Sequence, residues 1–181
     1  MKILFATAQR FPCQGGVSSY IEYNAPALRT RGHNVDIIST ADFSSYLTKE
    51  DLRKGKEQQL QIEQKLSPLL RPPFIQMEIV KNWLKLMYSH VDFSSYDLIH
   101  SQDGITSSLI RSLTNKPLIQ TVHSSFLGDA IRDFQDLTKT EARLLKRYDN
   151  FALTVPDRLI TVSKFIPPAF EAFPLDKRVV I

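Results

Sequence analysis

Three strand-like apolar runs of this chain are each followed directly by polar side chains that could bind or position a ligand. These polar segments are residues 100–103 (His-Ser-Gln-Asp), 123–125 (His-Ser-Ser) and 163–164 (Ser-Lys). The carboxyl ends of parallel strands meet at one edge of a sheet, and α/β folds bind their ligands at that edge. The sequence therefore predicts that these side chains converge on one crevice.

A glycine loop follows the first apolar run, residues 3–7, and precedes an amphipathic stretch that begins at Val17. Gly15 and Gly16 stand where the first N–H groups of a helix have no intrahelical partner and the helix dipole adds partial positive charge. Because glycine has no Cβ, a phosphate or a sugar can approach the backbone closely. The loop has neither the Gly-x-Gly-x-x-Gly fingerprint of dinucleotide sites nor the Gly-Lys-Ser/Thr of a P-loop, so a plain tight turn is the alternative.

His123 is the strongest candidate for direct contact with a ligand. It follows an apolar strand at once, and residues 124–128 after it give no strong helix signal, so we expect a loop that faces the crevice. Asp103 is better placed to cap the helix that follows it, and Ser163 has the same potential. His100 has two interpretations, a ligand contact or a hydrogen bond within a loop.

Other catalytic chemistries find little support in the residues. The four histidines and the single cysteine show no spacing typical of metal ligands, so no metal is expected. Ser124 is not part of a Gly-x-Ser-x-Gly elbow, which argues against a hydrolase. Cys13 lies in the glycine loop, where we interpret it as a small loop residue rather than a nucleophile. A single cysteine excludes an internal disulfide framework and fits a reducing cytosol.

The elements that must position these residues alternate along the chain. Strand-like runs are expected at residues 3–7, 35–39, 98–100, 117–122, 158–162 and 178–181. Helical patterns are expected between them, at residues 17–31, 48–90, 105–113, 130–148 and 165–173. This alternation predicts an α/β fold, a Rossmann-like parallel sheet with helices on both faces. Pro26 should kink the first helix or displace one of its hydrogen bonds, and Gly32 should end it.

The segment 48–90 is long for one crossover, and the prolines at 68, 72 and 73 should divide it into two helices. Its first half is mostly polar and is interpreted as a solvated helix. Apolar side chains recur at helical spacing within residues 75–90; they are Ile75, Ile79, Trp83, Leu86 and Met87. The favoured interpretation is a helix packed on the sheet with Lys81 and Lys85 outside. The alternative is a cationic amphipathic helix that contacts a membrane.

Length and composition describe one globular domain with a substantial core. The chain has 181 residues, 43% hydrophobic and 23% charged. No apolar run approaches the roughly 18 residues of a membrane span, and the start has no signal-peptide pattern. A cytoplasmic location is therefore expected, with peripheral contact at the inner face of the membrane as an option. The net charge of +4 permits an anionic ligand, but no dense basic stripe interleaved with aromatic residues indicates nucleic acid.

Several segments in a fixed order carry a resemblance. They are Gly15-Gly16-Val17, the amphipathic stretch after it, and residues 31–35 (Arg-Gly-His-Asn-Val), 96–100 (Tyr-Asp-Leu-Ile-His), 121–123 (Thr-Val-His) and 156–163 (Pro-Asp-Arg-Leu-Ile-Thr-Val-Ser). Together they resemble the N-terminal half of the family 4 glycosyltransferases. The resemblance covers residues 1–181 and is weakest over 42–94, where the unusual length of 48–90 departs from the commonest pattern.

The resemblance implies the GT-B architecture, two Rossmann-like domains that face each other across a cleft. It implies transfer of a sugar, with retention of anomeric configuration, from a nucleotide sugar such as UDP- or GDP-hexose to a sugar, lipid or small-molecule acceptor. The loop of Gly15, Gly16 and Val17 would approach the donor diphosphate and the acceptor, and His123 would contact the donor sugar. Asp103, Ser124 and the region 42–94 are acceptor candidates. The family's chemistry needs no protein nucleophile, metal or cofactor.

The chain ends within a strand-like run, residues 177–181. Together with the resemblance, this predicts an acceptor-side domain over residues 1–181 that would be followed by a C-terminal donor domain absent from this chain. That second domain would hold most of the donor, so the isolated chain is expected to be nearly inactive. The rival hypothesis is a stand-alone flavodoxin-like module that binds a phosphorylated metabolite without catalysis.

Overall fold

A parallel sheet forms the centre of the computed structural model, which describes residues 1–164, 166, 170, 174, 176 and 178–180. Within these residues the strands are β1 (Lys2–Ala6), β2 (Asn34–Ile38), β3 (Leu98–Ser101), β4 (Leu118–Val122), β5 (Arg158–Thr161) and β6 (Arg178–Val180). They lie in the order β2-β1-β3-β4-β5-β6, and every neighbouring pair is parallel. The chain leaves β1 towards one edge of the sheet and returns on its other side at β3, so the carboxyl ends of β1 and β3 form the topological switch point.

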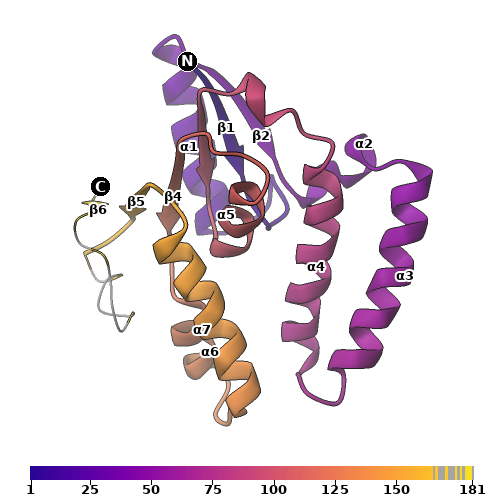
Figure 1. The fold of residues 1–181 in the computed structure, drawn as a ribbon. Helices are drawn as coiled ribbons and strands as arrows, with labels where there is room; N and C mark the ends of the chain where they lie inside the picture. The colour runs from indigo at the N-terminus through magenta and orange to yellow at the C-terminus, as the bar shows by residue number, and fades with distance from the viewer. Residues whose placement is uncertain (165, 167–169, 171–173, 175, 177, 181) are drawn as a thin grey trace.

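Seven α-helices of the described residues connect and cover the strands. They are α1 (Gly16–Thr30), α2 (Phe43–Tyr46), α3 (Lys49–Leu66), α4 (Pro72–Tyr88), α5 (Gly104–Arg111), α6 (Phe126–Asp133) and α7 (Lys139–Thr154). Two 3-10 turns, η1 (Thr40–Asp42) and η2 (Phe93–Ser95), stand beside β2 and β3 in the chain. Figure 1 shows the α3–α4 hairpin and the α6–α7 pair reaching beyond the carboxyl ends of the strands.

Alternating side chains of β1 build a separate core on each face of the sheet. Ile3 and Phe5 are buried with Val17, Ile21 and Ala25 of α1 and with Val35 of β2. Leu4 and Ala6 point the other way, into a larger core with residues of α4, α5 and α7. This confirms the prediction of a Rossmann-like parallel sheet with helices on both faces (Figure 1).

The first helix follows its sequence prediction closely. It continues through Pro26, which has no N–H to donate, and reaches Thr30. Gly32 then adopts a left-handed conformation with φ of 83°, and its N–H donates to the carbonyl of Arg29 at 2.9 Å. The predicted glycine end of this helix is therefore confirmed.

The single helix predicted over residues 130–148 is wrong, because the chain forms two helices there, α6 and α7. The start of α7 is a capping box in which Thr138 accepts from the N–H of Glu141 and the Glu141 carboxylate accepts from the N–H of Thr138. Ser125 caps α6 at the N–H of Gly128, 3.0 Å away, so residues 124–128 are not the open loop that we expected. The helix predicted over 165–173 falls largely outside the described residues.

The prolines between α3 and α4 divide the segment 48–90 into two helices, as predicted. Trp83 of α4 packs closely against α3. Its indole lies directly over Gly55, and its Nε1 donates to Gln59 at 3.2 Å. A Cβ added to Gly55 would lie 2.2 Å from that ring, so any other residue here would displace the indole. Ile75, Ile79, Leu86 and Met87 are buried, which favours the packed-helix interpretation of residues 75–90.

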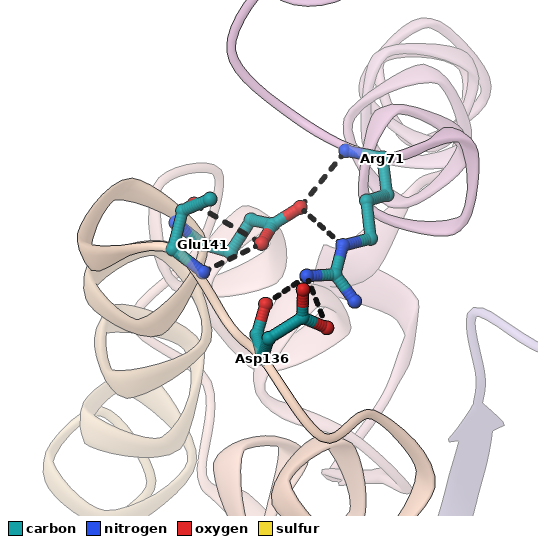
Figure 2. A network of polar contacts seen from close by, with 4 residues as sticks. Arg71, Asp136 and Glu141 are labelled. Atoms are coloured by element: carbon teal, nitrogen blue, oxygen red, sulfur yellow. Dashed lines mark hydrogen bonds and ion pairs between the residues drawn. The ribbon is translucent and has the colours of Figure 1, made fainter.

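An ion-pair network joins the hairpin to α7 (Figure 2). The Glu141 carboxylate, only 1% exposed, accepts from the backbone N–H of Arg71 at 3.0 Å and lies 3.3 Å from its guanidinium Nε. Arg71 also reaches Asp136, with 3.3 Å between Nη2 and the carboxylate oxygen. Burial opposes the charge on Glu141, but hydrogen bonds from Thr138 and Arg71 outweigh it and hold the pKa of this carboxyl below its usual range.

Candidate functional site

The loop between β1 and α1 leaves the start of that helix open. Gly15 is the N-cap residue, with φ of 141° and ψ of 166°, and it supplies no side chain to the helix. Both Gly15 and Gly16 are exposed, and a Cβ added to either would meet nothing within 4 Å among the described residues. The start of α1 is therefore open at Gly15 and Gly16, and an anion could approach the first N–H groups of the helix there.

Val17, the third residue predicted for this loop, is buried, unlike the exposed Gly15 and Gly16. Its side chain is 8% exposed and packs in the α1 core beside Ile21. The neighbouring Ser18 is buried, and its Oγ accepts from the N–H of Cys13 at 3.0 Å, which fixes the course of the loop into the helix.

His123 lies at the carboxyl end of β4, half-buried beside the same crevice. Its Nε2 is 3.0 Å from Oε1 of Gln102, and its ring meets Tyr20 edge-on with 5.4 Å between centroids. The amide nitrogen of Gln102 donates to the carbonyl of His100 at 3.5 Å, so the amide oxygen faces His123. With this orientation, Nε2 of His123 carries the proton and Nδ1 is free to accept one.

The environment of His123 keeps its imidazole neutral. Burial lowers its pKa from 6.5 to about 4, because a charged ring would lose hydration that the surroundings do not replace. At neutral pH this side chain can therefore donate and accept hydrogen bonds but carries no charge. It is suited to holding a hydroxyl group and unsuited to pairing with a phosphate.

His100 lies within the neighbouring strand β3, one residue before its end, and is buried. It is 7% exposed, its Nε2 is 2.7 Å from Oγ1 of Thr121, and its ring packs 4.6 Å from Phe5. Burial, with a smaller contribution from His123, lowers its pKa from 6.5 to about 3. Of its two predicted interpretations, hydrogen bonding is the one observed, although the partner lies in a strand and not in a loop. The ring of Tyr20 contacts both histidine rings edge-on.

Asp103 is the N-cap of α5, as its sequence position indicated. Oδ1 accepts from the N–H of Thr106 at 2.7 Å, and Oδ2 accepts from the N–H of Ala8 at 2.8 Å and from the Thr106 hydroxyl at 3.0 Å. Burial raises the pKa of this carboxyl in spite of these hydrogen bonds. Asp103 thus fastens the end of β1 to α5, and its oxygens already have partners.

Ser124 is exposed beside His123, whereas the next residue, Ser125, is buried. The Ser125 hydroxyl donates to Asp149 of α7 at 2.7 Å, and the same carboxylate accepts from the N–H of Phe126 at 2.7 Å. Burial raises the pKa of Asp149. This contact holds the start of α6, and so the position of Ser124, against α7.

Two adjoining hollows occupy the carboxyl edge of the sheet. The smaller, about 70 Å³, is lined by residues that include Val17, Gln102, Asp103, His123 and Ser124. The larger, about 200 Å³, lies against α4, and both are lined by Gln9, Asp103 and Phe126. The structure therefore brings His123, Ser124, Asp103 and Val17 to one place, whereas Gly15 and Gly16 lie outside this lining. Ser101 and His100 are buried.

Sequence reasoning missed the partners that orient His123. Gln102 was visible only as one polar residue in a run of four, and Tyr20 only as one apolar position of an amphipathic helix. Nothing in the local pattern indicates that both reach a residue at the end of another strand. Gln102 lies 21 residues from His123, and the contact arises because β3 and β4 are neighbours in the sheet.

Some negative observations apply to the described part of the chain. Within it, no three histidine, cysteine, aspartate or glutamate side chains gather closely enough to hold a metal ion. No helix there has the length and the apolar character needed to cross a membrane.

The strand order, the helices on both faces and the open helix start define a Rossmann-like α/β domain of the GT-B type. The chain belongs to glycosyltransferase family 4, because the family model described as Glycosyltransferase Family 4 matches residues 14–181. This confirms the resemblance found in the sequence. No curated protein sequence matches the chain.

A solved structure gives the same fold. The chain is similar to sucrose-phosphate synthase (tll1590) from Thermosynechococcus elongatus, with a TM-score of 0.61 and 14% sequence identity. The match covers 99% of this chain and 47% of that protein, so the chain spans about half the length of this relative. At such low identity the likeness concerns the fold, and the residues of the site must be argued from this chain itself.

Proposed function

We propose that this chain is the acceptor-side domain of a retaining glycosyltransferase that moves a sugar from a nucleotide sugar to an acceptor. The observation that carries the proposal is that the first turn of α1, through Val17, and the neutral, oriented His123 line one hollow at the switch point of a family 4 domain. An enzyme of this kind must hold a diphosphate and a sugar side by side. The start of α1 would bind the diphosphate, and His123 would bind the sugar.

The start of α1 would hold the donor diphosphate. Its free N–H groups suit the negative charge that develops on the leaving phosphate as the bond to the sugar breaks. The lack of a Cβ at Gly15 and Gly16 lets the phosphate oxygens come within hydrogen-bond distance of the backbone. In front-face transfer the leaving phosphate also helps to take the proton from the acceptor hydroxyl, so the reaction needs no protein nucleophile, and we expect no metal.

His123 would orient the donor sugar. Gln102 occupies its Nε2, which leaves Nδ1 to accept a hydrogen bond from a sugar hydroxyl near the reacting carbon. Because the ring stays neutral down to about pH 4, this hydrogen bond is present throughout the physiological range. Ser124, exposed beside it, is positioned to contact the acceptor, and Asp103 would serve as part of the wall.

The proposal is tested first by reading the natural coding frame past residue 181 and assaying the longer protein with UDP- and GDP-hexoses. A donor domain should follow, and the longer protein should give a product with retained anomeric configuration, measured by NMR. The 181-residue chain alone should transfer sugar far more slowly. An inverted product, or equal rates for the two proteins, would contradict the proposal.

The role of His123 is tested in the same assay. The variant His123→Ala should lower kcat/KM by about 100-fold, since it removes one oriented contact with the reacting sugar. The matched control is His90→Ala, which removes an exposed histidine that contacts Asp51 of α3, and it should keep the parent rate. A reading frame that stops at residue 181, with binding of a phosphorylated metabolite and no transfer, would favour the flavodoxin-like module instead.

A further inference from the structure

The larger hollow, about 200 Å³, opens between α4 and the carboxyl edge of the sheet. Met77 and Val80 of α4 form one wall, and Ile105 of α5 and Phe126 of α6 form the other. Ala8, Gln9, Pro73, Gln76 and Asp103 complete the lining. The hollow therefore brings together the loop after β1, the starts of α5 and α6, and α4, the second helix of the α3–α4 hairpin.

The chemistry of this lining is apolar. Three of its nine residues have polar side chains, and only one of those is ionisable, Asp103. The oxygens of Asp103 already accept from the N–H groups of Ala8 and Thr106, so they do not act as free acceptors. The lining contains no arginine, lysine or histidine, and it therefore cannot pair with a phosphate. A sugar ring, with hydroxyl groups on all sides, would lose hydrogen bonds here.

The hollow adjoins the proposed transfer site. Gln9, Asp103 and Phe126 line both it and the smaller hollow that contains His123 and Ser124. A molecule that spans both hollows would place an apolar group against α4 and a hydroxyl group beside His123. This is the arrangement that an acceptor with one apolar end and one polar end requires.

We propose that the larger hollow is an acceptor subsite for one uncharged, ring-sized apolar group, so that the acceptor is an aryl glycoside or a similar alcohol carrying an aromatic ring. Its role as an acceptor subsite rests on the proposed function. The size supports a single ring, because a dry protein cavity of roughly 150 Å³ accommodates benzene. Half-buried Phe126 and Met77 offer the ring and sulfur contacts that aromatic groups favour.

The test measures binding to the 181-residue chain by NMR titration, with no donor present. Phenyl β-glucoside should bind at least about tenfold more tightly than methyl β-glucoside, because only the phenyl group can leave water in the hollow. Octyl β-glucoside should bind no more tightly than the phenyl compound. Equal affinities for phenyl and methyl would overturn the proposal, and so would tenfold tighter binding of octyl, which would indicate a groove for a lipid chain.

Two variants locate the binding. Val80→Phe fills the hollow and should abolish the preference for phenyl. Gln76→Glu places a charge on an exposed residue of the lining and should weaken phenyl binding about threefold to tenfold with little effect on the fold. The matched control is Gln61→Glu, the same change at an exposed position of α3 outside the lining. A phenyl preference that Gln76→Glu and Val80→Phe leave unchanged would overturn the assignment.

The subsite and the proposed function fail separately. His123→Ala should keep the phenyl preference, because the preference depends on the hollow and not on the transfer site. Retained preference with no sugar transfer by the longer protein would refute the glycosyltransferase proposal and leave the subsite. Sugar transfer without any preference would refute the subsite and leave the function.

Discussion

Two of the helices that begin at the carboxyl edge of the sheet, α1 and α5, have starts that are built in opposite ways. The start of α1 has a glycine N-cap, no side-chain cap and open space around Gly15 and Gly16. The start of α5 is capped by Asp103, and a Cβ added to Gly104 would lie 2.5 Å from the carbonyl of Tyr148. Glycine therefore lets a ligand approach the backbone at the start of α1, whereas at the start of α5 it lets the backbone of α7 pack closely. The comparison teaches that a glycine at a helix start indicates a ligand site only when nothing in the protein occupies the space in front of it.

The largest effect should come from adding a methyl group at each start. Gly104→Ala should reduce the free energy of unfolding by about 3 kcal/mol, because the backbone of α7 blocks the new Cβ and cannot rotate away. Gly16→Ala should change it by no more than about 0.5 kcal/mol, since the site is open. Urea denaturation of both variants checks the pair. Similar losses for the two would show that the start of α1 is as closely packed as that of α5.

A smaller effect is expected from the cap itself. Asp103→Ala should reduce the free energy of unfolding by about 2 kcal/mol, because the N–H groups of Thr106 and Ala8 lose their acceptor. Asp103→Asn keeps one amide oxygen and should lose less than about 1 kcal/mol. Thermal and urea unfolding distinguish the two. If both variants kept the parent stability, the contact from β1 to α5 would not contribute to the fold.

Two histidines, the buried His100 and the half-buried His123 at the crevice, make the stability of the chain depend on pH. Burial lowers the pKa of His100 from 6.5 to about 3 and that of His123 to about 4. Above pH 6.5 each ring is neutral in the folded and unfolded chain. As the pH falls from 6.5, the unfolded chain binds protons that the folded chain does not, so the free energy of unfolding falls.

Unfolding measured between pH 7 and pH 4 should therefore show a slope that His100→Gln reduces. The amide of glutamine does not titrate in this range and can still bond to Thr121. His123→Gln should also reduce the slope, but over a narrower range that ends near its own pKa of about 4. An unchanged slope in His100→Gln would show that this ring does take up a proton in the folded chain.

The sequence predicted well what depends on local pattern. The strands, the open glycine loop and the division of residues 48–90 follow from apolar periodicity and from the position of prolines, all within a few residues. The cap at Asp103 was also visible, because it needs only a carboxylate just before an apolar helix. The start of α7 was missed because Thr138 and Glu141 were taken into one long helix, although their spacing is that of a capping box.

The parts of the site that the sequence did not show depend on contacts between distant segments. Gln102 orients His123 across two strands, and Tyr20 reaches the same ring from α1. The apolar hollow needs α4 to lie beside the end of β1, about 70 residues away along the chain. Only the folded sheet brings these segments together, so no window of sequence contains the signal.

The contact between Arg71 and Glu141 has a consequence for how the molecule opens. Glu141 caps α7 and accepts from Arg71 at the start of α4, so the same carboxylate anchors two elements. Opening the hairpin would leave a buried carboxylate with fewer partners and would loosen the first turn of α7 with it. The amide protons of α4 and of the start of α7 should consequently exchange with solvent as one cooperative unit. Helix α4, which forms one wall of the apolar hollow, then unfolds and refolds together with the start of α7, the helix against which Ser124 is held.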